Sequence, residues 1–179
     1  MKKKYAALVF CAIGLLLGSV TSEAKKKPSV TAESAIVMDV QSGAILYEKN
    51  IDKREYPASI TKVMTALVAI ENSSLSESVT YSRNAVSNLE AGASIIEIQP
   101  GEKLSMEDSL YAILLMSANE ACNGVAEHVA GSIDNFVAMM NQKAKELGCT
   151  GTNFANAKGL WMSNHYTTAD EMALFSQVA

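Results

Sequence analysis

The stretch Tyr-Pro-Ala-Ser-Ile-Thr-Lys at residues 56–62 most constrains the fold, because it has the features of a buried helix start. Apolar residues continue from it at helical spacing and would share one face: Ile60, Val63, Met64, Leu67 and Val68. Pro57 stands just ahead, where its fixed φ and missing N–H do not disturb a helix. We therefore predict a helix over about residues 59–71, with its apolar face in a core.

Two polar residues of this stretch, Ser59 and Lys62, stand three residues apart and would face the same side of the helix. Ser59 would lie at the helix N-terminus, where unpaired N–H groups create a positive potential. A serine becomes nucleophilic when a base removes its proton, and a lysine is a base only when its pKa is lowered. The pair is a candidate nucleophile and base. The same spacing also arises by chance, as at Ser22 and Lys25.

The N-terminus predicts a secretory signal over residues 1–24. Three lysines at positions 2–4 precede an apolar stretch, and small residues offer a cleavage site before residue 25. We predict a linker over residues 25–33 and one domain over residues 34–179. The net charge of −4 argues against a nucleic-acid partner.

The rest of the chain predicts a hairpin followed mainly by helices. Strands at residues 35–40 and 44–48 would be joined by a turn at residues 41–43, and residues 94–98 form a possible short strand. Further helices are expected after Ser105, over residues 120–130, from Ser132 to Gly148, and after Thr168. Cys122 and Cys149 are expected to be free thiols, and no Cys/His cluster has metal-ligand spacing.

A second short motif, Ser117-Ala118-Asn119, falls at the junction of two predicted helices. There its hydroxyl could pass a proton, and its amide could hold a substrate carbonyl or the lysine. Serine and asparagine also favour ordinary turns between helices. Ser82-Arg83-Asn84 has the same pattern, so this three-residue pattern alone does not distinguish a catalytic motif from an ordinary turn.

Together, Ser59-x-x-Lys62 and Ser117-x-Asn119 resemble the first two motifs of penicillin-recognising serine enzymes. Longer blocks are similar to the low-molecular-mass D-alanyl-D-alanine carboxypeptidases, the S11 peptidases: YPASITKVMTALVAIE, LLMSANEACNGVAEHVAG, AKELGCTGTNFANAKGL and HYTTADEMALFS. These blocks run from about residue 34 to the last residue, in the family's order. The resemblance implies an α/β, β-lactamase/transpeptidase-like domain with an antiparallel sheet flanked by helices.

The resemblance also implies an activity. Ser59 would attack the penultimate D-alanine carbonyl of a peptidoglycan stem pentapeptide, with Lys62 as general base, and penicillins would acylate the same serine. Ser117 would relay the proton to the leaving amine, and Asn119 would contact the substrate backbone. The Ser59 N–H would form half of an oxyanion hole. No cofactor and no metal are implied.

The family's third motif, Lys-Thr-Gly on an edge strand, is absent from the sequence. Cys149-Thr150-Gly151 looks like a degraded copy but follows Ser117 too closely, and Lys158-Gly159 lacks the threonine. We therefore expect residues 34–179 to be the N-terminal part of a longer domain, lacking its C-terminal strands. A C-terminal membrane anchor would also lie beyond residue 179, on an enzyme exported to the outer face of the cytoplasmic membrane.

Two alternatives are also compatible with the sequence. A class A β-lactamase-like hydrolase would need a glutamate to activate the deacylating water, and the loop over residues 159–168 has no carboxylate. A non-catalytic muropeptide-binding module is supported only by the missing third motif. The two histidines, His128 and His165, are expected to be structural, because Lys62 already takes the place of a base.

Overall fold

The computed structural model describes residues 28–87 and 89–179, so the predicted signal at residues 1–24 lies outside the described residues. Residues Thr31–Ala179 form one compact unit. Its elements, in chain order, are β1 (Ala35–Met38), β2 (Ile45–Lys49), the 3₁₀ helix η1 (Ala58–Ile60), α2 (Thr61–Asn72), β3 (Ser78–Thr80), α3 (Arg83–Val86), β4 (Lys103–Ser105), α4 (Met106–Leu115), α5 (Asn119–Ala130), α6 (Ile133–Glu146) and α7 (Ala169–Val178).

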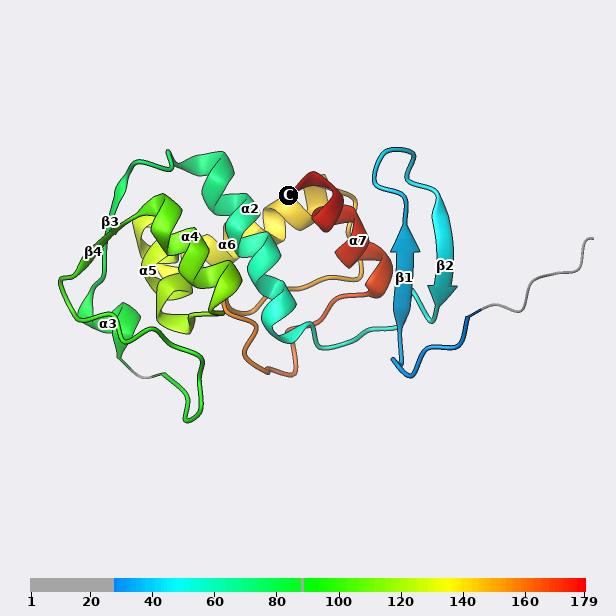
Figure 1. The fold of residues 1–179 in the computed structure, drawn as a ribbon, viewed down its shortest axis with the longest axis horizontal. Helices are drawn as coiled ribbons and strands as arrows, with labels where there is room; N and C mark the ends of the chain where they lie inside the picture. Colours follow the sequence, from blue (N-terminus) through cyan, green and yellow to red (C-terminus); the bar gives the residue numbers. More distant parts are fainter. Residues whose placement is uncertain (1–27, 88) are drawn as a thin grey trace, which may run out of the picture. The chain divides into compact units, whose positions relative to one another are not determined.

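Helix α2 is the centre of the core, and α4, α5, α6 and α7 all contact it (Figure 1). Met64, Leu67 and Val68 are buried, as their spacing predicted. The prediction was wrong for Ile60, which lies in the preceding 3₁₀ helix and is 52% exposed. The helix begins two residues later than we expected, at Thr61, because Ser59 lies in the preceding 3₁₀ helix. Tight i→i+3 turns of this kind are common at the N-termini of α-helices.

The predicted helix caps are confirmed. Ser105, Ser132 and Thr168 each accept a hydrogen bond through the hydroxyl oxygen. The donor is the N–H of the residue three positions later, at 2.9, 3.1 and 3.2 Å. Each cap satisfies an N–H that has no partner within its helix. Gly131 ends α5 with a left-handed φ of +74°, as a glycine after the last helical turn predicts.

The hairpin prediction is also confirmed: β1 and β2 pair antiparallel, and α7 packs against β1. The proposed strand at residues 94–98 is wrong. Its backbone bonds to α5 instead, where Ser94 O accepts from Asn119 N–H at 2.8 Å, and Glu97 has a left-handed φ of +63°. The second antiparallel pair is β3 with β4, two strands too short to give a periodic signal.

The fold class is confirmed as mixed α/β, with antiparallel strand pairs accompanied by helices. Cys122 and Cys149 are buried free thiols, as predicted. Within the described part of the chain, no helix is long and apolar enough to cross a membrane.

Candidate active site

The structure brings the four predicted site residues together at the N-terminal end of α2. Ser59 comes from η1, Lys62 from the first turn of α2, Ser117 from the α4–α5 junction, and Asn119 begins α5. Lys62 Nζ lies 3.4 Å from Ser59 Oγ and 2.9 Å from Asn119 Oδ1. Ser117 Oγ lies 3.1 Å from Ser59 Oγ.

A hollow of about 310 Å³ opens beside these residues. Its polar lining is Ser59, Lys62 and Ser117. Its apolar lining comes from η1, α2 and α4: Ile60, Val63, Ile113 and Leu114. The exposed hydroxyls therefore face a space that a small ligand could enter, with apolar walls on two sides.

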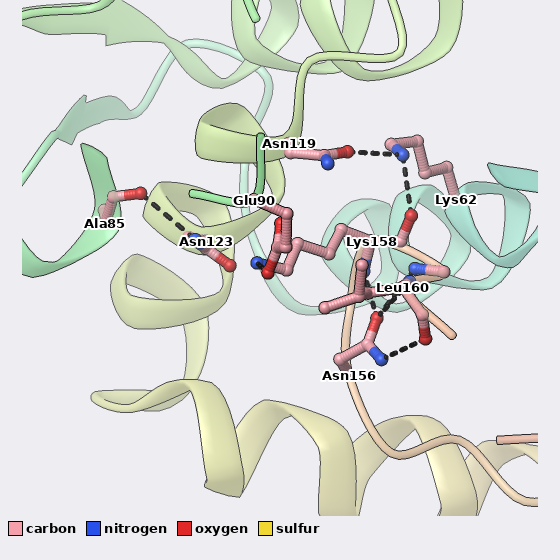
Figure 2. Close-up of polar contacts among 9 residues, drawn as sticks. Lys62, Ala85, Glu90, Asn119, Asn123, Asn156, Lys158 and Leu160 are labelled. Carbon is pink, nitrogen blue, oxygen red and sulfur yellow. Dashed lines mark hydrogen bonds and ion pairs between the residues drawn. The ribbon is translucent and has the colours of Figure 1, made fainter. Parts of the chain in front are cut away.

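The contacts of Lys62 determine where the lone pair of its neutral form would point. Its two shortest contacts are with Asn119 Oδ1 at 2.9 Å and the Lys158 main-chain oxygen at 2.7 Å (Figure 2). Both are carbonyl oxygens, which can only accept hydrogen bonds. A neutral amine has two N–H groups and one lone pair, so these oxygens engage both N–H groups. As an ammonium, Lys62 also donates to its third neighbour, Ser59 Oγ. In the neutral form, the lone pair is left for that oxygen.

The surroundings of Lys62 favour its neutral form. Its side chain is only 3% exposed, and burial lowers its pKa below the ordinary value of 10.5. The nearby cation of Lys158 acts in the same direction. A buried ammonium loses hydration, and a second positive charge repels it. Both causes move Lys62 toward the state in which it can accept a proton.

A turn over residues 156–160, which the sequence analysis did not identify, supplies one of the two oxygens that hold Lys62. Asn156 Oδ1 accepts from the N–H groups of Lys158, Gly159 and Leu160, at 3.2, 2.8 and 2.9 Å. Asn156 Nδ2 donates to Leu160 O at 2.8 Å. The available signal was an asparagine shortly before a glycine, which is typical of a side-chain-stabilised turn.

Two residues beside the candidate nucleophile have left-handed backbones. Ala58 has a φ of +48° and Ser117 a φ of +56°. For residues with a Cβ atom this conformation costs about 1–2 kcal/mol each, and it clusters at functional sites. Neither residue is glycine or asparagine, so no residue type in the sequence indicated this strain.

Gly159 lies against the peptide bond that precedes Ser59. A Cβ atom at this position would be 1.8 Å from Ala58 O, and the backbone φ is +82°. We expect Gly159→Ala to lower the free energy of unfolding by about 3 kcal/mol or more, because backbone clash adds to left-handed strain. It should also lower reactivity at Ser59, whose main chain must move.

Gly148→Ala is the matched control for this prediction. Gly148 has the same φ of +82°, but a Cβ there would meet nothing within 4 Å. This variant should lose only the left-handed strain, about 1–2 kcal/mol. Urea unfolding of both variants measures the difference, and equal losses would contradict the close approach of Gly159 to Ala58.

The two histidines lie in structural positions. His165 is buried, its Nε2 lies 2.8 Å from Thr61 Oγ1, and its Nδ1 accepts from Ala155 N–H at 3.0 Å. Burial lowers the pKa of His165, so the neutral ring joins the loop to α2. His128 lies outside this loop and pairs with Glu77 at 2.9 Å.

The residues that looked like remnants of the third motif have other partners. Thr150 and Gly151 donate their N–H groups to Glu171 Oε1, at 2.7 and 2.6 Å, and do not lie on a strand. The ammonium of Lys158 is bound to Glu90. In the described part of the chain, no group of three or more His, Cys, Asp or Glu residues could hold a metal ion.

Comparisons with known proteins agree with this geometry. The family model described as D-alanyl-D-alanine carboxypeptidase, peptidase S11, matches residues 21–179. The chain belongs to this carboxypeptidase family. The resemblance of its motif blocks to the S11 peptidases is thereby confirmed.

Individual relatives in the carboxypeptidase family show how much of their length this chain spans. D-alanyl-D-alanine carboxypeptidase DacF of Bacillus subtilis is 38% identical over 151 residues, which are 82% of this chain and 38% of that protein. DacC of Escherichia coli is 36% identical over 158 residues, 84% of this chain and 40% of that protein. The chain thus spans about two fifths of the length of these relatives.

The fold also matches that of a solved penicillin-binding protein. Penicillin binding protein 5 from Haemophilus influenzae superposes with a TM-score of 0.80 and 32% identity, over 85% of this chain and 46% of that one. The expected transpeptidase-like fold is therefore confirmed for the matched portion.

Proposed function

We propose that the protein is a serine-type D-Ala-D-Ala carboxypeptidase that shortens peptidoglycan stem pentapeptides. Ser59 Oγ attacks the carbonyl carbon of the penultimate D-alanine while its proton passes to Lys62 Nζ. The tetrahedral intermediate collapses, the C–N bond breaks, and terminal D-alanine leaves. Water then attacks the ester carbonyl, which releases the shortened peptide and restores the Ser59 hydroxyl.

The observation that carries this proposal is the bonding of Lys62. Two carbonyl oxygens occupy its N–H groups, so the lone pair of the neutral amine is left for Ser59 Oγ at 3.4 Å. A base must lie within reach of the proton it removes, and such contacts are often long before substrate binds. Burial lowers the pKa of Lys62, which favours the neutral amine that this role requires.

The neighbouring polar groups have distinct roles in this reaction. Ser117 Oγ, 3.1 Å from Ser59 Oγ, is placed to relay the proton to the departing amine. Asn119 holds Lys62 through Oδ1, which leaves its amide N–H groups for the substrate backbone. The Ser59 N–H is one donor for the oxyanion. No cofactor enters any of these steps.

The proposal extends to partners and location. β-Lactams present a reactive carbonyl in place of the D-Ala-D-Ala bond, so they should acylate Ser59. A signal at residues 1–24 would export the enzyme, and an anchor beyond residue 179 would hold it on the membrane surface that faces peptidoglycan.

Rapid β-lactam hydrolysis is not favoured by the arrangement of carboxylates. Glu90 is paired with Lys158, and Glu171 accepts from the N–H groups of Thr150 and Gly151. Both oxygens of Glu171 accept hydrogen bonds within the protein, and Glu90 is engaged through Oε1. The acyl-enzyme formed with a β-lactam is therefore expected to be long-lived.

The test is release of D-alanine from a synthetic peptide ending in D-Ala-D-Ala, using the protein at its full natural length. We expect steady release, and loss of that release after preincubation with penicillin. A folded protein that binds the peptide without releasing D-alanine would favour the muropeptide-binding alternative. Rapid turnover of a chromogenic cephalosporin would favour the β-lactamase alternative.

A further inference from the structure

An ion pair beside the candidate active site has no part in the proposed reaction. Lys158 Nζ lies 2.8 Å from Glu90 Oε1, and the side chain of Lys158 is only 11% exposed. The other oxygen, Glu90 Oε2, is buried and has no hydrogen-bond partner in the described part of the chain. Lys158 is largely removed from water, whereas the Glu90 side chain is 32% exposed. Removing a charge from water is costly, so such an ion pair is weak evidence for a stabilising role.

The segment that carries Glu90 is also tied to α5. Ser94 O accepts from Asn119 N–H at 2.8 Å, and Glu120 Oε1 accepts from Ile96 N–H at 2.6 Å. Residues 89–98 therefore link the start of α5 to the turn at residues 156–160. These are the two segments whose oxygens hold Lys62 (Figure 2).

We propose that Lys158, held by Glu90, is a positioning residue that fixes the orientation of Lys62 through its own main-chain carbonyl. This inference rests on the proposed function. Figure 2 shows the Lys158 side chain running toward Glu90 while its carbonyl oxygen meets Lys62. Asn156 fixes the backbone on either side of that carbonyl, and Glu90 fixes the side chain.

Helix α2 donates two side-chain hydrogen bonds to this turn. Lys62 Nζ donates to Lys158 O at 2.7 Å, and Thr65 Oγ1 donates to Ala157 O at 2.6 Å. Lys62 and Thr65 are three residues apart, so they lie on the same face of the helix. A shift of the turn would move the partner of Lys62 and turn its lone pair away from Ser59.

The charge of Lys158 gives the inference a measurable signature. Burial is the main cause that lowers the pKa of Lys62, and the Lys158 cation lowers it further. Glu90 offsets part of the Lys158 charge. Cys122 on α5 would oppose this effect only as a thiolate. Burial raises the pKa of Cys122 to about 12, so it stays neutral in the assay.

The experiment measures the rate constant for acylation by a fluorescent penicillin from about pH 5 to about pH 10, on the protein at its full natural length. Lys158→Met should slow acylation about 10- to 100-fold at neutral pH. It should also move the acidic limb of the pH–rate profile, where the rate rises as Lys62 loses its proton, to higher pH, because a nearby positive charge is lost. Lys158→Arg keeps the charge and the ion pair, so it should stay within a few-fold of wild type.

Glu90→Gln should move the acidic limb in the opposite direction, because the Lys158 cation is then uncompensated. Lys143→Met is the matched control: Lys143 pairs with Glu71 at 2.5 Å and joins α6 to α2, outside the candidate site. This control should keep the wild-type rate and limb. Thermal melts of each variant distinguish a loss of the fold from a change in the orientation of Lys62.

The inference is overturned if Lys158→Met keeps the wild-type rate and limb, or if Lys158→Arg is as slow as the methionine variant. A wild-type protein that no penicillin labels would instead overturn the proposed function. The two failures are therefore distinguishable in the same assay.

Discussion

Replacing Ser59 with alanine is expected to abolish D-alanine release and penicillin labelling. The reaction has no other acceptor for the acyl group, so the rate should fall roughly 10⁴-fold or more. The fold should survive, because the change removes one oxygen from a short 3₁₀ helix with no buried residues. Peptide hydrolysis and fluorescent penicillin labelling measure the loss, and a thermal melt checks the fold.

Ser163→Ala is the control for this experiment. Ser163 lies in the loop that follows the turn at residues 156–160, and its side chain is exposed. Surface substitutions of this kind usually change stability by less than about 0.5 kcal/mol. This variant should be labelled like wild type. Persistent labelling of Ser59→Ala would contradict the assignment of the nucleophile.

Lys62→Met is expected to have the second largest effect. Methionine keeps an unbranched side chain in the core but provides no base, so acylation at neutral pH should fall about 10²- to 10⁴-fold. The Ser59 hydroxyl remains in place, so noncovalent peptide binding should persist. Acylation kinetics compared with peptide binding separate these two steps.

The pH dependence of acylation in wild type and in Lys62→Met gives a sharper test. Wild-type acylation should rise with pH, because the reactive form of Lys62 is the neutral amine. Its midpoint should lie below the ordinary lysine pKa of 10.5, because burial lowers the Lys62 pKa. Lys62→Met should lack this limb. An unchanged limb in the variant would show that another group is the base.

The sequence predicted those features that depend on local chemistry. The caps at Ser105, Ser132 and Thr168 were visible because one side chain satisfies a nearby N–H group. The hairpin of β1 and β2 was visible from its turn and its strand-like runs. The proximity of Ser59 to Lys62 follows from their three-residue spacing near a helix start.

Other features depend on contacts between distant segments and had no local signal. Lys158 reaches Glu90 across 68 positions and Lys62 across 96 positions. The strand expected at residues 94–98 was wrong because Glu120 and Asn119, not a neighbouring strand, bind its backbone. The pairing of β3 with β4 spans three residues on each side, too few for alternation to be visible.

The location of the penicillin adduct tests the central claim most directly. The protein at its full natural length is incubated with a β-lactam and digested, and the modified peptide is sequenced by mass spectrometry. We predict one adduct, on Ser59, in the peptide that contains Tyr56 and Lys62. An adduct on Ser117, or on any residue outside that peptide, would contradict the account.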